Sequence, residues 1–167
     1  MNKNGFSFNT MIIIIYAVLA VMLGIRVFKG IKARKELKGE VKEFKKKASP
    51  FEYVLIIMLI VIGALNFISV SEGQKIYSYL VGIMMFVIAL FFFLNLTMKI
   101  KIAENGILAD GSFNTYKEIK KWGFDKDNGD LVMLTKVDHQ EEQKVIKARL
   151  EDMVEINNLI RKYKLGK

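Results

Sequence analysis

Three long stretches of this 167-residue chain carry no charged side chain, although charged residues make up 26% of the sequence. The stretches cover residues 4–25, 53–71 and 76–98, and they are rich in Ile, Leu, Val, Phe and Met. A helix needs about 20 apolar residues to cross a hydrocarbon core of roughly 30 Å. Buried helices of a soluble protein keep a polar stripe, which these stretches lack. The sequence therefore predicts three transmembrane helices, at about residues 6–28, 51–71 and 76–98.

The densest positive charge lies between the first two predicted spans. Residues 29–47 hold nine Lys or Arg against three Glu, whereas the segments next to the other span ends hold few basic residues. Lys and Arg in short loops favour the cytoplasmic side of a membrane. We therefore expect a multi-pass protein of the cell membrane, with its N-terminus outside and its C-terminus in the cytoplasm.

The same basic loop shows apolar residues at helical spacing, at Leu37, Val41, Phe44 and Ala48. This pattern predicts an amphipathic helix that lies on the inner leaflet and binds anionic lipids. One alternative is a topology signal without lipid contact, and another is a loop whose Leu37, Val41 and Phe44 pack against the C-terminal segment. Nucleic acid is not expected as a partner, because the loop lies against the membrane and lacks interleaved aromatic residues. The candidate lipid contacts are Lys32, Arg34, Lys35, Lys38, Lys42, Phe44, Lys45, Lys46 and Lys47.

The predicted spans contain no ionisable group at depth, which transporters and proton relays usually need. The second and third spans hold one side-chain amide each, Asn66 and Asn95, and we expect interhelical hydrogen bonds from them. Ala20, Gly24 and Gly63 are small residues that favour close approach of helices. These features are typical of a membrane anchor.

Residues 99–167 are different in character, with fourteen basic and twelve acidic residues. Turn signals occur at residues 104–106 ("ENG"), 110–111 ("DG") and 127–130 ("DNGD"). Helical periodicity follows in "LEDMVEINNLIRKY". The segment therefore predicts one small antiparallel sheet covered by a C-terminal helix, and with the spans it gives an α+β membrane protein. The candidate strands are 99–104, 107–116, 119–126, 130–137 and 143–149.

Two motifs in this segment, "IAENGIL" and "YKEIKKWGF", carry a family resemblance. Their Gly106-Ile107 pair and the residues Tyr116, Ile119 and Trp122 match a pattern in the small PH-like domains of bacterial membrane proteins, which the segment resembles. With spans preceding the domain, the whole arrangement is similar to an uncharacterised family of bacterial integral membrane proteins. The resemblance covers about residues 98–165, which are too few for the seven strands of a full PH domain.

The resemblance implies that the matching aromatic and Ile side chains face the domain core, and strand alternation places Phe124 on the face of Trp122. The expected core residues are Ile107, Tyr116, Ile119, Trp122 and Phe124. The expected domains are a membrane domain of residues 1–98, including the basic cytoplasmic loop 29–50, and a cytoplasmic PH-like domain of residues 99–167.

The sequence shows no Ser-His-Asp set, Gly-rich phosphate loop or metal-binding cluster. It has no cysteine, and its one histidine, His139, lies in "DHQEE", most simply a polar hairpin turn. "DKDNGD" at 125–130 resembles the start of a calcium loop, but Gly129 stands at the fifth position and Lys136 at the twelfth, where a Glu is required. We therefore expect no catalytic, metal or cofactor-binding residues.

These observations favour a non-enzymatic membrane protein that presents a small cytoplasmic PH-like module for binding or scaffolding. Its partners would be anionic membrane lipids and a membrane or cytoplasmic protein. The alternative is an immunity-type or regulatory membrane protein that acts through its transmembrane helices.

Overall fold

The computed structural model describes residues 8–68, 75–137 and 140–166, in two compact units. One unit comprises Met1–Ile25 and Ser49–Asn95, and the other comprises Arg26–Ala48 and Leu96–Lys167. The predicted division placed the basic loop with the spans, whereas the structure groups residues 26–48 with the C-terminal part. Most of the link between the second and third spans, and His139 of the predicted hairpin turn, lie outside the described residues.

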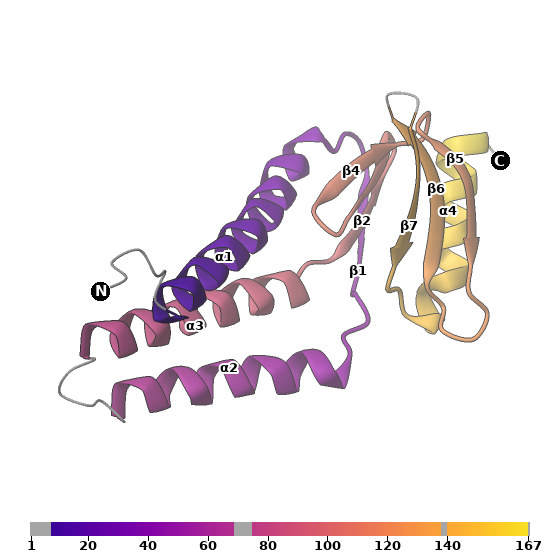
Figure 1. The fold of residues 1–167 in the computed structure, drawn as a ribbon. Helices are drawn as coiled ribbons and strands as arrows, with labels where there is room; N and C mark the ends of the chain where they lie inside the picture. Colours follow the sequence, from indigo (N-terminus) through magenta and orange to yellow (C-terminus); the bar gives the residue numbers. More distant parts are fainter. Residues whose placement is uncertain (1–7, 69–74, 138–139, 167) are drawn as a thin grey trace. The chain divides into compact units, whose positions relative to one another are not determined.

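Three long helices carry the uncharged stretches: α1 (Phe8–Ala33), α2 (Pro50–Ile68) and α3 (Lys75–Leu96) (Figure 1). All three are long and apolar enough to cross a membrane, as the sequence predicts. The start of α2 is fixed by local chemistry, because the backbone N–H of Ser49 donates to Glu52 Oε2 over 2.9 Å. Pro50 then occupies the first helical position, where no backbone N–H is needed.

Small residues determine how α2 and α3 pack in the first unit. A Cβ atom on Gly82 would lie 3.0 Å from the carbonyl oxygen of Gly63 and 2.6 Å from the ring of Phe67. The Phe67 ring also stacks on Tyr79 and Phe86, at centroid distances of 5.5 and 5.9 Å. The two backbones approach closely because neither glycine has a side chain.

The hydrogen bond predicted between helices from Asn66 is wrong. Asn66 Nδ2 donates over 2.8 Å to the carbonyl oxygen of Ile62, one turn earlier in the same helix. This local bond satisfies the amide without a partner from another helix.

The second unit contains seven strands within the described residues, arranged in two antiparallel sheets. One sheet has the order β1-β2-β3-β4 and the other β5-β6-β7. The expectation of one sheet is therefore wrong. Residues 98–165 hold six of these strands, which agrees with the expectation that they are too few for seven. The strands are β1 (Val41–Phe44), β2 (Ile100–Ala103), β3 (Gly106–Ala109), β4 (Ser112–Thr115), β5 (Ile119–Phe124), β6 (Leu131–Val137) and β7 (Gln140–Ile146).

The seventh strand comes from the basic loop, where the sequence predicts an amphipathic helix. That prediction is wrong: only the short 3₁₀ turn η1 (Arg34–Glu36) follows α1, and Val41–Phe44 then form β1. β1 pairs antiparallel with β2, and Phe44 lies opposite Ile100. The strand is favoured because β2 supplies partners for its backbone and a covered face for Phe44, whose exposed fraction is 5%.

Asn105, in the turn between β2 and β3, holds the segment that leads into β1. Its side-chain oxygen accepts from the backbone N–H of Lys38 over 2.9 Å. Its side-chain nitrogen donates to the carbonyl oxygen of Glu36 over 2.8 Å. One amide therefore satisfies two backbone groups of the incoming chain.

The predicted strand 107–116 is wrong as a single element, because Asp110 and Gly111 turn the chain between β3 and β4. Their φ angles are 49° and 80°, which is the conformation of a two-residue hairpin turn. The β5–β6 turn is closed by Asp125, whose carboxylate accepts from the backbone N–H of Asp127 over 2.9 Å. This hydrogen bond lowers the pKa of Asp125.

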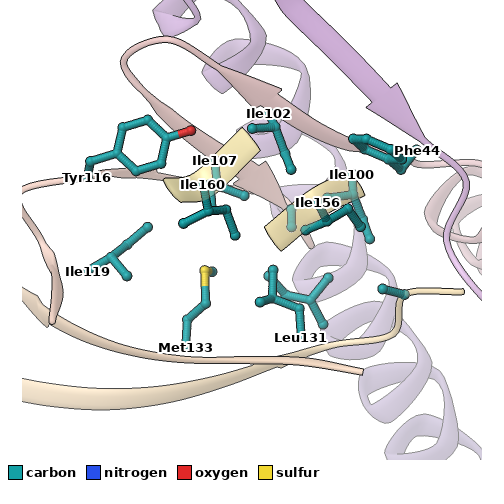
Figure 2. Packing of buried hydrophobic residues seen from close by; sticks show 13 residues of the cluster. Phe44, Ile100, Ile102, Ile107, Tyr116, Ile119, Leu131, Met133, Ile156 and Ile160 are labelled. Carbon is teal, nitrogen blue, oxygen red and sulfur yellow. The ribbon is translucent and has the colours of Figure 1, made fainter. Parts of the chain in front are cut away.

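The helix α4 (Met153–Leu165), preceded by the 3₁₀ turn η2 (Leu150–Asp152), completes the second unit. Its residues Ile156 and Ile160 are fully buried. Figure 2 shows them in one apolar cluster with Phe44, Ile100 and side chains of the other sheet. The core combines β1, both sheets and α4; its members are Phe44, Ile100, Ile102, Ile107, Ala109, Tyr116, Ile119, Leu131, Met133, Ile146, Ala148, Ile156 and Ile160.

Candidate functional site

The basic residues proposed for lipid contact divide into two groups in the structure. Lys32, Arg34, Lys35, Lys38 and Lys45 have exposed side chains. The other members hold the second unit together and are described next. Lys42 and Lys47 are exposed as well, so among the proposed basic residues only Lys46 is partly covered.

Three lysines of the loop bind other parts of the second unit. Lys42 forms an ion pair with Glu155 of α4. Lys46 donates to Asp110 Oδ1 over 2.7 Å, and Lys47 donates to the carbonyl oxygen of Asn128 over 3.2 Å. Phe44 lies in the core and does not offer its ring to a lipid surface.

Glu43 links β1 to β2 on the face opposite the core. It accepts from Lys99 Nζ over 2.7 Å and also from Lys101, which is its cross-strand neighbour. The hydrogen bonds from Lys101 and Lys99 lower the pKa of Glu43 to about 2. This carboxylate therefore stays ionised down to acidic pH and holds the two strands together.

The five residues expected in the domain core lie in the buried cluster or pack against it. Ile107, Tyr116 and Ile119 belong to the buried cluster, and Trp122 and Phe124 are partly buried against it. The hydroxyl of Tyr116 donates to the carbonyl oxygen of Ala103 over 2.8 Å, and burial raises its pKa. The tyrosine therefore stays neutral and fastens the chain after β4 to β2.

A groove lies between β5 and α4, beside Trp122. It has a volume of about 530 Å³ and is lined by Trp122, Asn158, Arg161 and Leu165. Trp122 is held in place because its Nε1 donates to Asn157 Oδ1 of α4 over 3.1 Å. The groove therefore offers an aromatic ring, an aliphatic side chain, an amide and a guanidinium group. We refer to it as the β5–α4 groove.

The free edge of β5 adjoins this groove. β5 is the first strand of its sheet and pairs with β6 alone among the described strands. Near its start, Lys164 of α4 donates to the carbonyl oxygens of Tyr116 and Ile119 over 2.7 and 2.5 Å. Past that point an extended chain can pair with the edge and place its side chains in the groove.

The groove residues Asn158, Arg161 and Leu165 were not predicted from the sequence. They stand three and four positions apart, so they share a helix face away from Ile156 and Ile160. Such a polar face usually contacts only solvent, whereas here it lines the β5–α4 groove beside Trp122. Across the described residues, no group of three or more His, Asp or Glu is placed to hold a metal ion.

Comparisons with known proteins identify one conserved domain. Residues 98–165 match DUF5673, a domain of unknown function. The match runs from the start of β2 to the end of α4 and leaves β1 outside. No solved structure and no curated protein sequence matches the chain.

The Glu43 network predicts a pH-dependent stability. The folded pKa lies below the ordinary value of 4.5, so the stabilisation is present above about pH 4.5 and is lost as the pH falls toward 2. The side chain is 37% exposed, and solvent screening limits the effect to about 0.5–1 kcal/mol. Glu43→Gln should lower the unfolding temperature of the detergent-purified protein at pH 7 and lower it much less near pH 2, where the carboxylate is losing its charge.

Glu151→Gln is the matched control, because Glu151 pairs with Arg149 over 3.0 Å but is 71% exposed. It should change the unfolding temperature less than Glu43→Gln at pH 7. An equal loss for both variants at every pH would show that the Glu43 network contributes nothing specific.

Proposed function

We propose that the three apolar helices span a membrane, with the N-terminus outside and the C-terminus in the cytoplasm. Each helix exposes large apolar side chains; Met22, Ile57 and Leu90 have exposed fractions of 64%, 60% and 55%. Water-soluble proteins rarely expose apolar surface on this scale, and lipid chains would cover it. The basic residues 29–47 favour the cytoplasm for the loop between α1 and α2.

The pairing of β1 with β2 supports this topology. The two strands lie in one sheet, so they must lie on the same side of any membrane. Between them the chain forms α2 and α3, which would cross the membrane and return. A topology with one crossing between β1 and β2 is incompatible with this sheet.

On this proposal the second unit is a cytoplasmic PH-like module that binds a partner without turnover. Seven antiparallel strands in sheets of four and three, followed by a C-terminal helix, agree with the seven strands expected of a full PH domain. The motifs "IAENGIL" and "YKEIKKWGF" add the sequence resemblance. This support concerns the fold, and the binding function rests on the β5–α4 groove.

The groove favours an extended segment of a membrane or cytoplasmic protein as the ligand. A peptide backbone can pair with the free edge of β5, and an apolar side chain can pack between Trp122 and Leu165. An acidic side chain can bind Arg161, whose guanidinium group fits a carboxylate in bidentate geometry. The observation that carries the proposal is this groove beside an unpaired strand edge.

Anionic lipids are proposed as a second class of partner. The exposed residues Lys32, Arg34 and Lys35 follow directly on the apolar part of α1, and Lys45 lies five residues before the start of α2. Each basic residue near an anionic surface adds about 1 kcal/mol of attraction. These side chains would therefore lie among lipid headgroups if α1 and α2 span the membrane.

Fusion reporters test the membrane topology. A reporter joined after Lys167 should be active in the cytoplasm, and one inserted at Gly73 should be active outside. The physical reason is the positive charge of the loop, which resists translocation. A cytoplasmic signal at Gly73 would contradict the proposed topology.

The loop has two proposed roles, which are to set the membrane topology and to bind anionic lipids. Charge variants in the same reporter strain distinguish them. Reversing the charges of Lys45, Lys46 and Lys47 should loosen the orientation. Replacing Lys32, Arg34 and Lys35 by Gln should lower the amount of anionic lipid that copurifies with the protein. Unchanged lipid content would leave these three residues as a topology signal alone.

Peptide binding tests the module. The purified protein should select, from a library of extended peptides, sequences that combine an acidic residue with apolar ones. Arg161→Glu should weaken binding of a selected peptide at least tenfold, which corresponds to about 1.4 kcal/mol. The measurement is fluorescence anisotropy of the labelled peptide with the full-length protein in detergent.

Arg149→Glu serves as the control because it makes the same charge change outside the groove, in the segment between β7 and η2. It should leave peptide affinity within about twofold of the unaltered protein. Equal weakening by both variants would show that the effect comes from net charge and not from the groove. The absence of any selected peptide would refute the groove as a binding site.

A further inference from the structure

A second cleft lies between the edge strands of the two sheets. β4 ends one sheet and β7 ends the other, and the cleft between them has a volume of about 420 Å³. Its lining is mainly polar, in contrast to the apolar core that fills the rest of the space between the sheets. The side chains that matter for its chemistry are Arg26, Asp110, Ser112, Asn114, Glu142 and Lys144.

Lys144 has a mostly covered side chain, and its two hydrogen-bond partners, Asn114 and Ser112, are neutral. It lies opposite the fully buried Met133, on the inner face of β7, and its side chain is 21% exposed. Its Nζ donates to Asn114 Oδ1 over 2.8 Å and approaches Ser112 Oγ at 3.5 Å. The carboxylate beside it, Glu142 at 3.6 Å, is 69% exposed and offers weak compensation. A covered ammonium group of this kind favours an additional anion beside it.

Asn114 supplies an unpaired donor in the same lining. Its exposed fraction is 2%, and its side-chain oxygen accepts from Lys144. Its Nδ2 is buried and has no acceptor in the described part of the chain. An unsatisfied buried donor costs about 1–3 kcal/mol, so folded proteins normally pair such groups.

The charged side chains that line the cleft balance one another, but Asp110 is occupied by cations. Asp110 is shared by two cations, Lys46 at 2.7 Å and Arg26 at 3.7 Å. The lining holds two cations, Arg26 and Lys144, and two carboxylates, Asp110 and Glu142, and Lys46 reaches Asp110 from outside the lining. The Asp110 carboxylate is thus already neutralised and does not repel an incoming anion strongly.

We propose that this cleft binds a phosphate group, with its oxygens accepting hydrogen bonds from Lys144 and Asn114. A phosphate supplies a closer counter-charge for Lys144 than Glu142 does at 3.6 Å, and it supplies the acceptor that Asn114 Nδ2 lacks among the described residues. Ser112 Oγ already donates to the carbonyl oxygen of Ala109 over 3.3 Å and accepts from Lys144, so it adds no donor of its own. The phosphate comes from a lipid headgroup or from a soluble phosphate ester; the lipid source rests on the proposed membrane topology, under which Arg26 follows the uncharged residues 4–25.

Calorimetry on the full-length protein in neutral detergent tests the site. The probes are inorganic phosphate, glycerol phosphate and a short-chain phosphatidic acid. We expect saturable binding of at least one of them with one site per chain. Lys144→Met, which keeps the length of the side chain and removes its charge, should weaken that binding at least tenfold.

Lys120→Met is the matched control, since Lys120 is an exposed residue of β5 outside the cleft. It should bind the probes as the unaltered protein does. Should Lys144→Met fail to unfold cooperatively, Asn114→Leu replaces it. This variant loses the unsatisfied Nδ2 donor together with the Oδ1 that accepts from Lys144, so its cooperative unfolding is checked first. That variant should bind the probe at least fivefold more weakly.

The probes also identify the source of the phosphate. If phosphatidic acid binds at least tenfold more tightly than glycerol phosphate, the source is a lipid headgroup. Similar affinities of the two probes indicate a soluble ester. The proposal is overturned if no probe binds, if Lys144→Met binds like Lys120→Met, or if Asn114→Leu binds like the unaltered protein. In the last case the buried amide is only an unpaired group of the fold.

Discussion

Antiparallel pairing between Val41–Phe44 and Ile100–Ala103 is the constraint on which the second unit depends. It brings together segments that α2 and α3 separate along the chain. Phe44 closes the core beside Ile100, and Glu43 fastens the opposite face through Lys99 and Lys101. The β2 strand would otherwise be an open sheet edge, which proteins normally cover or pair. The domain match at residues 98–165 therefore lacks one strand of the folded unit.

This constraint also connects folding with any membrane insertion. The sheet forms only when the segments before α2 and after α3 meet, so the α2–α3 pair is an insertion within the order of strands. The close contact between Gly63 and Gly82 holds that pair together. Packing in the first unit and completion of the sheet in the second are thus joined by the covalent chain.

Elements with a strong local signal could be predicted from the sequence. The three apolar helices follow from uninterrupted hydropathy, and α4 follows from the spacing of Ile156 and Ile160. β1 could not be predicted, because its identity depends on a partner strand far along the chain. Its four residues include Lys42 and Glu43, and the helical spacing of Leu37, Val41 and Phe44 concealed the alternation that puts Phe44 inward.

The residues of the candidate sites could likewise be predicted from the sequence only in part. Ile107, Tyr116 and Ile119 carry an apolar pattern that marks a core, and the structure places them in the buried cluster. Asn114 and Lys144 carry no such pattern, since they lie on different sheets and meet only when the sheets pack. Arg161 resembles any solvated helix residue until Trp122 is placed beside it. Sites built from edges of separate elements therefore require the tertiary structure.

A disulfide between β1 and β2 tests the central claim most directly. The chain has no cysteine, so Glu43→Cys with Lys101→Cys creates a single pair at cross-strand neighbours. Mild oxidation in native membranes, followed by cleavage at a protease site inserted at Gly73, should leave the two fragments joined until reductant is added. Lys42→Cys with Lys101→Cys, whose side chains lie on opposite faces of the sheet, should give separate fragments. Separate fragments for both pairs, or equal joining in both, would contradict the pairing of β1 with β2.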